Sequence, residues 1–298
     1  MSNTRLSGVI AAVPTPYDGE RRIDFDAFLE HARFCLENGC DALNVLGTTG
    51  EANSLSTATR KLIMTEAARG LDPAWLMVGT GTPDLDTTAE LTRHAHTLGF
   101  KAALVLPPYY YKPLADDALF AWFSALIAMT ANASIGLYLY NFPQLTGLTF
   151  SPALAARLRE TFPERLLGAK DSSGNLDYAR ELARIEGFDV FPSNEASLAD
   201  AARDGFAGCI SATVNVDPAA AQALWRNQQD EVLRGKVLAL RQAVSARPLI
   251  PAVKYLAGRR SGNDTWLTVS PPLLPLTTED KAALDPIHGG LKSESKAA

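Results

Sequence analysis

The chain has 298 residues, of which 47% are hydrophobic and 20% are charged, the usual balance of a globular protein that buries a large core. Its 28 basic and 33 acidic residues give a net charge of −5. No basic face or run of lysines appears, which argues against a protein that works on nucleic acid or on a membrane surface.

The three cysteines indicate the compartment. Cys35, Cys40 and Cys209 show no C-x-x-C spacing and have no histidine partner nearby, so we expect buried, inert thiols rather than a disulfide framework or a zinc site. The first ten residues lack the layout of a signal peptide, and no apolar run approaches the length of a membrane span. We therefore expect a cytoplasmic protein.

Eight short apolar runs alternate with amphipathic segments along the chain. The runs are continuously apolar rather than alternating, which is typical of parallel strands that are covered on both faces. The predicted strands are 8–16, 42–47, 75–81, 102–108, 134–143, 166–170, 188–193 and 208–215.

A helical pattern follows each predicted strand. Asp24 and Ser151 suit helix N-caps, and Gly39, Gly99 and Gly187 suit helix ends. Eight strand-then-helix units predict an α/β fold of the (β/α)₈ TIM-barrel type. A flavodoxin-like open sheet is the alternative, but it seldom needs eight strands, and no G-x-G-x-x-G follows the first one. The predicted helices are 24–39, 58–70, 87–99, 116–131, 151–162, 175–187, 198–205 and 217–228.

The alternation ends after residue 228. Segments 232–244 and 250–260 are predicted to be additional helices, and the final "GGLKSESKAA" is expected to fray. The sequence thus predicts a barrel over 1–228 and a C-terminal helical extension over 229–298 that packs on the barrel.

Reactive side chains fall at the carboxyl ends of the predicted strands, where barrel active sites form. None of these ends offers a set of His, Asp and Glu suited to a metal, and the four histidines lie on helical or tail segments. The side chains at the strand ends are Thr48 and Thr49, Tyr109, Tyr110 and Tyr111, Tyr140, Lys170, Ser193 and Asn194.

The stretch "LLGAKDSSG" places Lys170 at the end of an apolar run. Burial disfavours the ammonium form of an amine, and a neutral amine attacks a ketone to give a Schiff base. Tyr140 could then move protons, with a neighbouring hydroxyl as relay. The "GTTGE" turn, with two threonine hydroxyls and backbone N–H groups, suits the carboxylate of a small 2-oxo acid such as pyruvate.

Each of these residues has a structural alternative. Lys170 alone could extend to solvent or pair with Asp171, and Lys254 in "PAVKY" is expected to be structural. The joint occurrence of the amine, the phenol and the turn at successive strand ends favours an active site.

Five motifs occur in register from about residue 6 to about residue 277. They are "GTTGE", "YNFP…TG", "GAKDSSGN", "G-x-x-G-x-IS" at 205–211, and "PAVKY". Together they make the chain resemble the dihydrodipicolinate synthase / N-acetylneuraminate lyase family of class I, Schiff-base aldolases.

The resemblance implies catalytic roles for four residues. Lys170 would form the Schiff base with the 2-oxo acid, and Tyr140 would be the general acid/base. Thr48 would join the proton relay, and Tyr110 matches a tyrosine that reaches into the neighbouring subunit's site. The resemblance also implies a homotetramer built as a dimer of dimers, with no metal or organic cofactor.

The resemblance also implies substrate contacts. Thr49 and Gly50 would hold the carboxylate, the backbone carbonyl of Ile210 would face the substrate, and Ser193 lies at the end of the seventh strand. Leu145 stands where true dihydrodipicolinate synthases have the arginine that holds aspartate semialdehyde. Sialate lyases have a leucine there, but their usual turn reads G-S-T-G-E. The positions that would bind feedback lysine also depart from the usual pattern, so lysine inhibition is not expected.

The sequence therefore predicts a Schiff-base-forming lyase, an aldolase or dehydratase. Its substrate would be a 2-keto-3-deoxy sugar acid or a related 4-hydroxy-2-oxo acid, with pyruvate as the Schiff-base partner. The alternative is a 4-hydroxy-tetrahydrodipicolinate synthase, which condenses pyruvate with aspartate semialdehyde. A metal-dependent barrel aldolase and a non-enzymatic sensor of 2-oxo acids are the competing classes.

Overall fold

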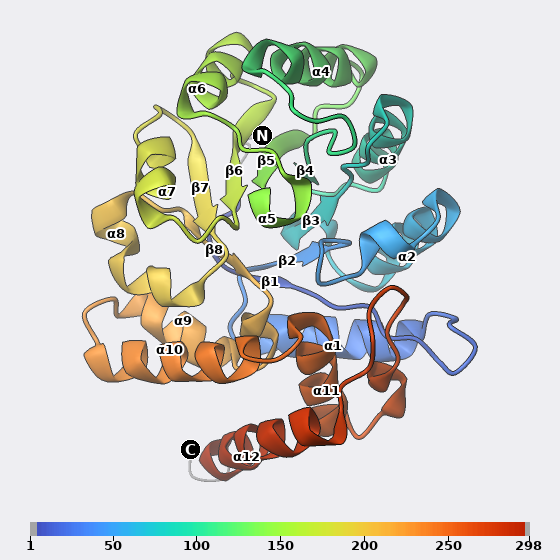
Figure 1. Ribbon diagram of the computed structural model, residues 1–298, viewed down its shortest axis with the longest axis vertical. Coiled ribbons are helices and arrows are strands. Elements are labelled where there is room, and N and C mark those ends of the chain that lie inside the picture. The colour runs from blue at the N-terminus through green and yellow to red at the C-terminus, as the bar shows by residue number, and fades with distance from the viewer. Residues whose placement is uncertain (1–4, 296–298) are drawn as a thin grey trace.

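The computed structural model describes residues 5–295, and in it a ring of parallel strands is surrounded by helices (Figure 1). The strands neighbour one another in the order β7-β6-β5-β4-β3-β2-β1-β8, and the Ala207 N–H donates to the Val190 carbonyl across the remaining seam at 2.9 Å. The predicted (β/α)₈ barrel is confirmed, and the open-sheet alternative is excluded. The strands are β1 (Gly8–Ala12), β2 (Ala42–Val45), β3 (Leu76–Gly79), β4 (Ala102–Val105), β5 (Gly136–Asn141), β6 (Leu166–Asp171), β7 (Asp189–Pro192) and β8 (Gly208–Ser211).

Strand side chains are buried on both faces of the sheet, which explains the continuously apolar runs. One set, including Ile10, Met77, Leu104 and Ile210, fills the barrel interior. Its neighbours along the strands join the larger core between sheet and helices. A side chain that is in register with members of this inner set therefore points into the barrel.

The helices lie close to where the sequence places them. The Asp24 and Ser151 side chains accept hydrogen bonds from the first turns of their helices, as predicted, and Gly39, Gly99 and Gly187 have positive φ. The predicted helix 198–205 is instead a 3-10 helix, η3 (Glu195–Asp200), that leads into a short α8 (Ala201–Asp204). The other barrel helices are α1 (Phe25–Glu37), α2 (Thr57–Gly70), α3 (Leu85–Thr97), α4 (Asp116–Met129), α5 (Pro143–Thr146), α6 (Pro152–Thr161), α7 (Leu176–Ala183) and α9 (Pro218–Arg226).

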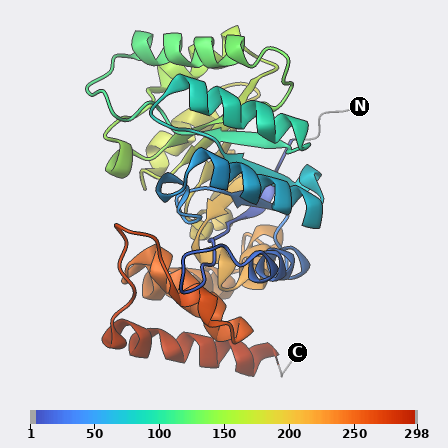
Figure 2. The ribbon, with the colours of Figure 1, turned by 90° about the vertical axis from the view of Figure 1, so that its right-hand side faces the viewer.

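The C-terminal segment forms α10 (Glu231–Ser245), α11 (Leu249–Ser261) and α12 (Thr278–Ser295) on one side of the barrel (Figure 2). The expected fraying of "GGLKSESKAA" is wrong as far as Ser295, and residues 296–298 lie outside the described part. The interior Pro286 and the glycine pair that follows it disguise α12 in the sequence. The fully buried Leu284 side chain and a 2.7 Å hydrogen bond from Tyr255 to Asp285 hold α12 to the body. The division of the chain at residue 228 stays a prediction.

The cysteines are free and buried, as expected. The expectation that they have no histidine nearby is wrong, because His31 Nε2 lies 3.7 Å from Cys35 Sγ. The two residues are one turn apart on the inner face of α1, where His31 also meets Asn215 Oδ1 at 3.0 Å. Within residues 5–295 we find no helix with the length and apolar character needed to cross a membrane.

Candidate active site

Lys170 points into the barrel. In the sheet it is in register with Tyr140 on one side and Phe191 on the other, and both belong to the inner set of side chains. Register partners in adjacent parallel strands project to the same face, so the lysine side chain enters the interior, where it is 4% exposed. Close packing explains why residue 168 in "LLGAK" is a glycine, because a Cβ at Gly168 would lie 2.0 Å from the Asp189 carbonyl oxygen.

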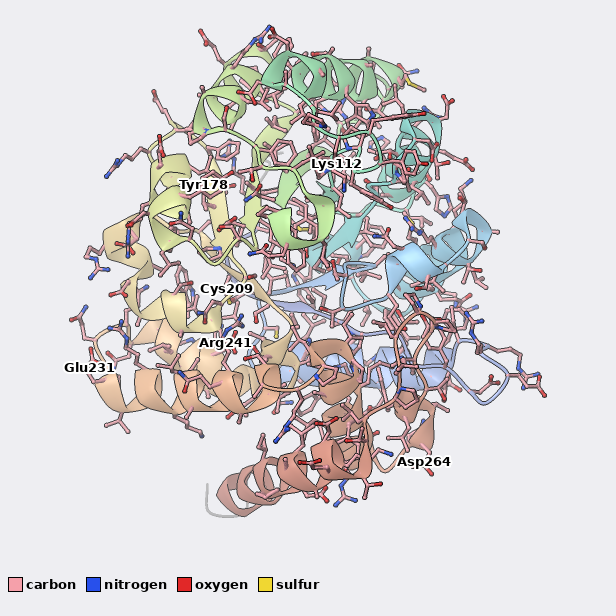
Figure 3. The ribbon with its side chains drawn as sticks, in the orientation of Figure 1. Lys112, Tyr178, Cys209, Glu231, Arg241 and Asp264 are labelled. Carbon is pink, nitrogen blue, oxygen red and sulfur yellow. The ribbon has the colours of Figure 1, made fainter. Side chains whose placement is uncertain are left out.

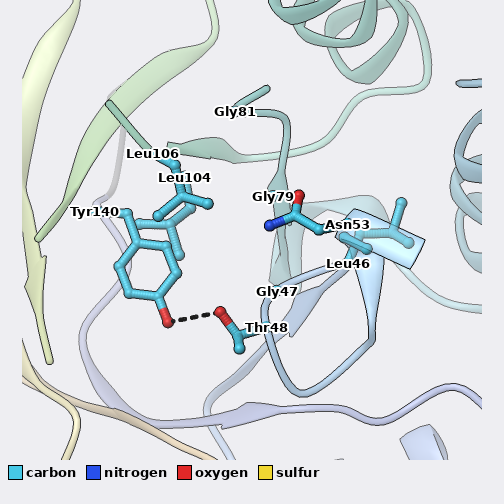
Figure 4. Close-up of a pocket in the computed structure, with 10 residues that line it drawn as sticks. Leu46, Gly47, Thr48, Asn53, Gly79, Gly81, Leu104, Leu106 and Tyr140 are labelled. Atoms are coloured by element: carbon cyan, nitrogen blue, oxygen red, sulfur yellow. Dashed lines mark hydrogen bonds between the residues drawn. The ribbon is translucent and has the colours of Figure 1, made fainter. Parts of the chain in front are cut away.

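An amine, a phenol and a hydroxyl form one line at the strand ends. Lys170 Nζ donates to Tyr140 Oη at 3.3 Å, and Tyr140 Oη lies 3.2 Å from Thr48 Oγ1. Figure 4 shows the Tyr140–Thr48 contact at the edge of a cavity. The Lys170 nitrogen also sits 4.5 Å from the centre of the Tyr140 ring. The phenol oxygen therefore connects the amine to the "GTTGE" turn.

The structural alternative for Lys170 fails on geometry. Its neighbour Asp171 projects to the opposite face, where Oδ1 accepts a 2.8 Å hydrogen bond from Asn141 Nδ2 and Oδ2 accepts one from the Ser173 hydroxyl. The pKa of Asp171 is raised, because the effect of burial outweighs that of these hydrogen bonds. The described contacts of Lys170 thus run toward Tyr140 and not toward Asp171 or bulk solvent.

The "GTTGE" turn is built on close backbone approaches. Leu46, directly before the turn, and Glu51, its last residue, both have left-handed backbone with φ of 55° and 57°. The turn packs on β3, where a Cβ at Gly79 would lie 2.0 Å from the Leu46 carbonyl oxygen. The Thr15 hydroxyl donates to the Gly50 carbonyl at 2.8 Å. Left-handed backbone at non-glycine residues is strained, and these contacts with the surrounding structure hold it in place.

A small cavity, partly open to solvent, lies between this turn and Tyr140. Its lining is mixed, with leucines and glycines beside the Thr48 hydroxyl and the Asn53 amide (Figure 4). Arg60 donates to Asn53 Oδ1 at 3.2 Å, which leaves the Asn53 Nδ2 donor for the cavity. Arg60 and Asn53 were not predicted as residues of the active site; both lie in the segment 51–60, which includes positions compared with a feedback-lysine site.

The predicted substrate contacts fall into two groups. Thr49, Gly50 and Ile210 are buried at the strand ends, and Ile210 is in register with Ile10 in the barrel interior. Ser193 directly follows β7, and its carbonyl accepts a 3.1 Å hydrogen bond from Arg241 on α10. These four positions surround the same mouth of the barrel as Lys170.

Tyr110 and Leu145 do not reach the amine within one chain. The Tyr110 side chain is 74% exposed and packs edge-to-face on Tyr111, with ring centres 5.3 Å apart. Leu145, on the short helix α5, is 61% exposed. Both residues lie on the surface of the chain.

Two buried carboxylates beside the site escaped the sequence analysis. Glu51 closes the "GTTGE" turn and pairs with Lys254, and Glu195 follows β7 and pairs with Arg241. The structural role expected for Lys254 is compatible with this pairing. Among the residues whose side chains are described, no group of three or more His, Cys, Asp or Glu is placed to hold a metal ion. His288 lies in α12, and its side chain is outside the described part.

The geometry defines a barrel with an amine–phenol–hydroxyl site at the carboxyl ends of its strands. The Dihydrodipicolinate synthetase family matches the chain over residues 5–288. The chain belongs to this family, and it is a carbon–carbon or carbon–oxygen lyase of the dihydrodipicolinate synthase / N-acetylneuraminate lyase group.

Three solved structures illustrate the relationship. Dihydrodipicolinate synthase from Agrobacterium tumefaciens is 31% identical, covers 96% of this chain and 99% of its own, and superposes with a TM-score of 0.88. YagE, a prophage protein of the dihydrodipicolinic acid synthase family from E. coli K12 solved in complex with pyruvate, is 25% identical, with coverages of 97% and 99% and a TM-score of 0.88. N-acetylneuraminate lyase from Proteus mirabilis is 27% identical, with coverages of 96% and 99% and a TM-score of 0.85.

Proposed function

We propose that this lyase binds a 2-oxo acid as a Schiff base on Lys170 and then makes or breaks a carbon–carbon or carbon–oxygen bond of the bound acid. The observation that carries the proposal is the line Lys170–Tyr140–Thr48, with successive separations of 3.3 and 3.2 Å. A buried amine next to a phenol supplies both a nucleophile and a proton carrier. The pyruvate complex of YagE supports pyruvate as the keto partner.

The reaction begins when the Lys170 nitrogen attacks the keto carbon. A nitrogen–carbon bond forms, and the carbonyl oxygen takes two protons, one of them lost by the amine nitrogen. The carbon–oxygen bond then breaks, and the oxygen leaves as water to give an iminium. Tyr140, 3.3 Å from the amine, is placed to deliver and remove these protons. Thr48 accepts or returns the phenol proton on the other side.

The iminium then draws electrons from the neighbouring carbon. In a 4-hydroxy-2-oxo acid, loss of the 4-hydroxyl proton breaks the C3–C4 bond, and the electron pair forms an enamine. An aldehyde departs, the enamine carbon takes up a proton, and water releases pyruvate from the lysine. The chemistry needs no cofactor, because the iminium formed on Lys170 is the electron sink.

The other predicted contacts orient the substrate in this proposal. The carboxylate lies on Thr49 and Gly50, in the turn that the surrounding contacts fix. The Ile210 carbonyl and Ser193, at the ends of β8 and β7, face the opposite side of the same mouth. The reacting carbon is thereby held between the turn and the lysine.

Tyr110 completes the relay from a second copy of the chain in this proposal. Its side chain extends 74% exposed from the loop after β4, and the cavity beside Thr48 and Tyr140 has the mixed apolar and hydroxyl lining that suits a phenol. A homotetramer built as a dimer of dimers would cover the exposed Tyr110 side chain and fill the cavity with the phenol of a second copy. The free, buried cysteines are compatible with a reducing cytoplasm.

Leu145 favours a neutral or hydroxylated second substrate. An apolar side chain at the mouth gives no bidentate clamp for a second carboxylate. We therefore place 2-keto-3-deoxy sugar acids and related 4-hydroxy-2-oxo acids first. Condensation of pyruvate with aspartate semialdehyde is the second candidate, supported by the 31% identity to the Agrobacterium synthase.

A substrate screen tests the proposal. The enzyme is offered 2-keto-3-deoxy acids, sialic acid and aspartate semialdehyde with pyruvate, and pyruvate formed or consumed is measured. We expect turnover of a 2-keto-3-deoxy acid that is lost in Lys170→Ala and retained in Lys112→Ala, an exposed loop lysine. Turnover that survives in Lys170→Ala, or that disappears with a chelator, would refute the lysine mechanism.

A further inference from the structure

The C-terminal helices send two cations to carboxylates that follow barrel strands. Lys254 on α11 meets Glu51, after β2, with a Nζ–Oε1 distance of 2.7 Å. Arg241 on α10 meets Glu195, after β7, at 2.9 Å, and Figure 3 labels it on the barrel side of α10. Of these two pairs, the Lys254–Glu51 pair is sealed from solvent, with 0% exposure of both side chains.

Glu51 is the last residue of the turn that carries Thr48. Its backbone is left-handed, with φ of 57°, and its N–H donates to the Thr48 carbonyl at 3.0 Å. Its second carboxylate oxygen, Oε2, accepts a 2.6 Å hydrogen bond from the Ser270 N–H. The position of the Thr48 backbone is thus tied through one side chain to two points of the C-terminal segment.

Lys254 is enclosed on its remaining sides. Its nitrogen lies 4.3 Å from the centre of the Tyr17 ring, which is itself buried, and the Tyr17 N–H is bonded to the Thr265 carbonyl. The ammonium therefore bridges the turn, the loop after β1 and α11.

A buried ion pair is a poor means of stabilising a fold. The cost of removing two charges from water often exceeds their attraction, and apolar replacements of the same volume are frequently as stable. Burial lowers the pKa of Lys254 to about 8 although the charge of Glu51 raises it, so desolvation outweighs the pairing here. Conformational precision of the turn explains the pair better than stability does.

We infer that Lys254 and Glu51 are positioning residues that hold the Thr48 hydroxyl at proton-transfer distance from Tyr140. They act through the backbone of the turn and do not touch the substrate. The inference rests on the proposed Schiff-base function, in which Thr48 passes protons to Tyr140. It assigns to the C-terminal helices a part in the chemistry of the barrel mouth.

The role separates two steps that can be measured with pyruvate alone. Capture of pyruvate by Lys170 is read by borohydride trapping. Proton transfer at the iminium is read as deuterium entering the pyruvate methyl group in D₂O, followed by NMR. A displaced Thr48 slows the second step and leaves the trapped stoichiometry unchanged.

The test compares Lys254→Met, Glu51→Gln and the double variant with the wild-type enzyme. We expect the single variants to exchange deuterium roughly 100-fold more slowly, the usual effect of misplacing a catalytic group by about 1 Å. The double variant leaves no unpaired buried charge, so it should fold even if a single variant does not, and its exchange should remain at least about tenfold slow. The trapped stoichiometry should match that of the wild type throughout.

Tyr255→Phe is the matched control. It removes a hydrogen bond between α11 and α12 one residue from Lys254, without touching the turn. We expect a loss of thermal stability comparable to that of the Lys254 and Glu51 variants, with deuterium exchange at the wild-type rate. A folded double variant that exchanges at the wild-type rate, or a Tyr255→Phe variant that slows exchange equally, would overturn the inference. Failure of the wild-type enzyme to trap pyruvate would instead refute the proposed function.

Discussion

Removal of the Tyr140 hydroxyl is the sharpest test of the proton path. Tyr140→Phe leaves a ring of the same shape in a site that is 3% exposed, so packing is preserved. Two hydrogen bonds, to Lys170 and Thr48, are lost, and each is worth about 1 kcal/mol. The free energy of unfolding should therefore fall by about 2 kcal/mol or less, and the variant should stay folded.

The effect on proton transfer should be larger. A positioned general acid/base contributes about 10²- to 10⁴-fold, equivalent to about 3 to 5 kcal/mol of activation free energy. Deuterium incorporation into the pyruvate methyl group should slow by that factor, while borohydride still traps pyruvate on Lys170. Tyr178→Phe is the control, since it removes a half-buried phenol on α7 that donates a 2.7 Å hydrogen bond to the Phe150 carbonyl. Wild-type exchange in Tyr140→Phe would remove this residue from the mechanism.

Three further predictions concern specificity, the turn and pH. Leu145→Arg should shift the ratio of kcat/KM values toward aspartate semialdehyde by about tenfold or more, and steady-state kinetics that show no gain would contradict the role proposed for Leu145. Gly79→Ala places a Cβ against the Leu46 carbonyl, so thermal denaturation should show a loss of about 1 to 3 kcal/mol together with slower turnover, and an unchanged melting temperature would refute the packing argument. The pKa of Lys254 is about 8 in the folded protein against an ordinary 10.5, so the unfolded chain binds more protons than the folded one between these pH values. The free energy of unfolding therefore rises with pH through Lys254, by up to about 3 kcal/mol. Denaturant unfolding of wild type and Lys254→Met at pH 7.5 and 10 measures this, and a difference between the two that does not change with pH would contradict it.

The barrel could be predicted because its strands are local and apolar on both faces. Glycine and N-cap positions such as Asp24 and Gly39 then marked the helices between them. Helix α12 could not be predicted, because tertiary contacts of Leu284 and Asp285 override a proline and a glycine pair. Element boundaries shifted where a 3-10 turn replaced the predicted seventh helix.

The site was predictable where residues lie at strand ends, and unpredictable where partners are distant. Lys170, Tyr140 and Thr48 converge because parallel strands end at the same face of a barrel. Glu51 and Lys254 are 203 positions apart, and nothing in either local sequence shows that they pair. The role of Tyr110 depends on a second copy of the chain, so it stays a prediction.

Borohydride trapping of pyruvate on Lys170 is the most direct test of the proposed mechanism. The intact enzyme is incubated with pyruvate and borohydride, digested, and mapped by mass spectrometry. We expect a reduced pyruvyl adduct on the peptide that contains Lys170, absent from Lys170→Ala and still present in Lys112→Ala. An adduct on another lysine, or the same yield of adduct from Lys170→Ala, would contradict it.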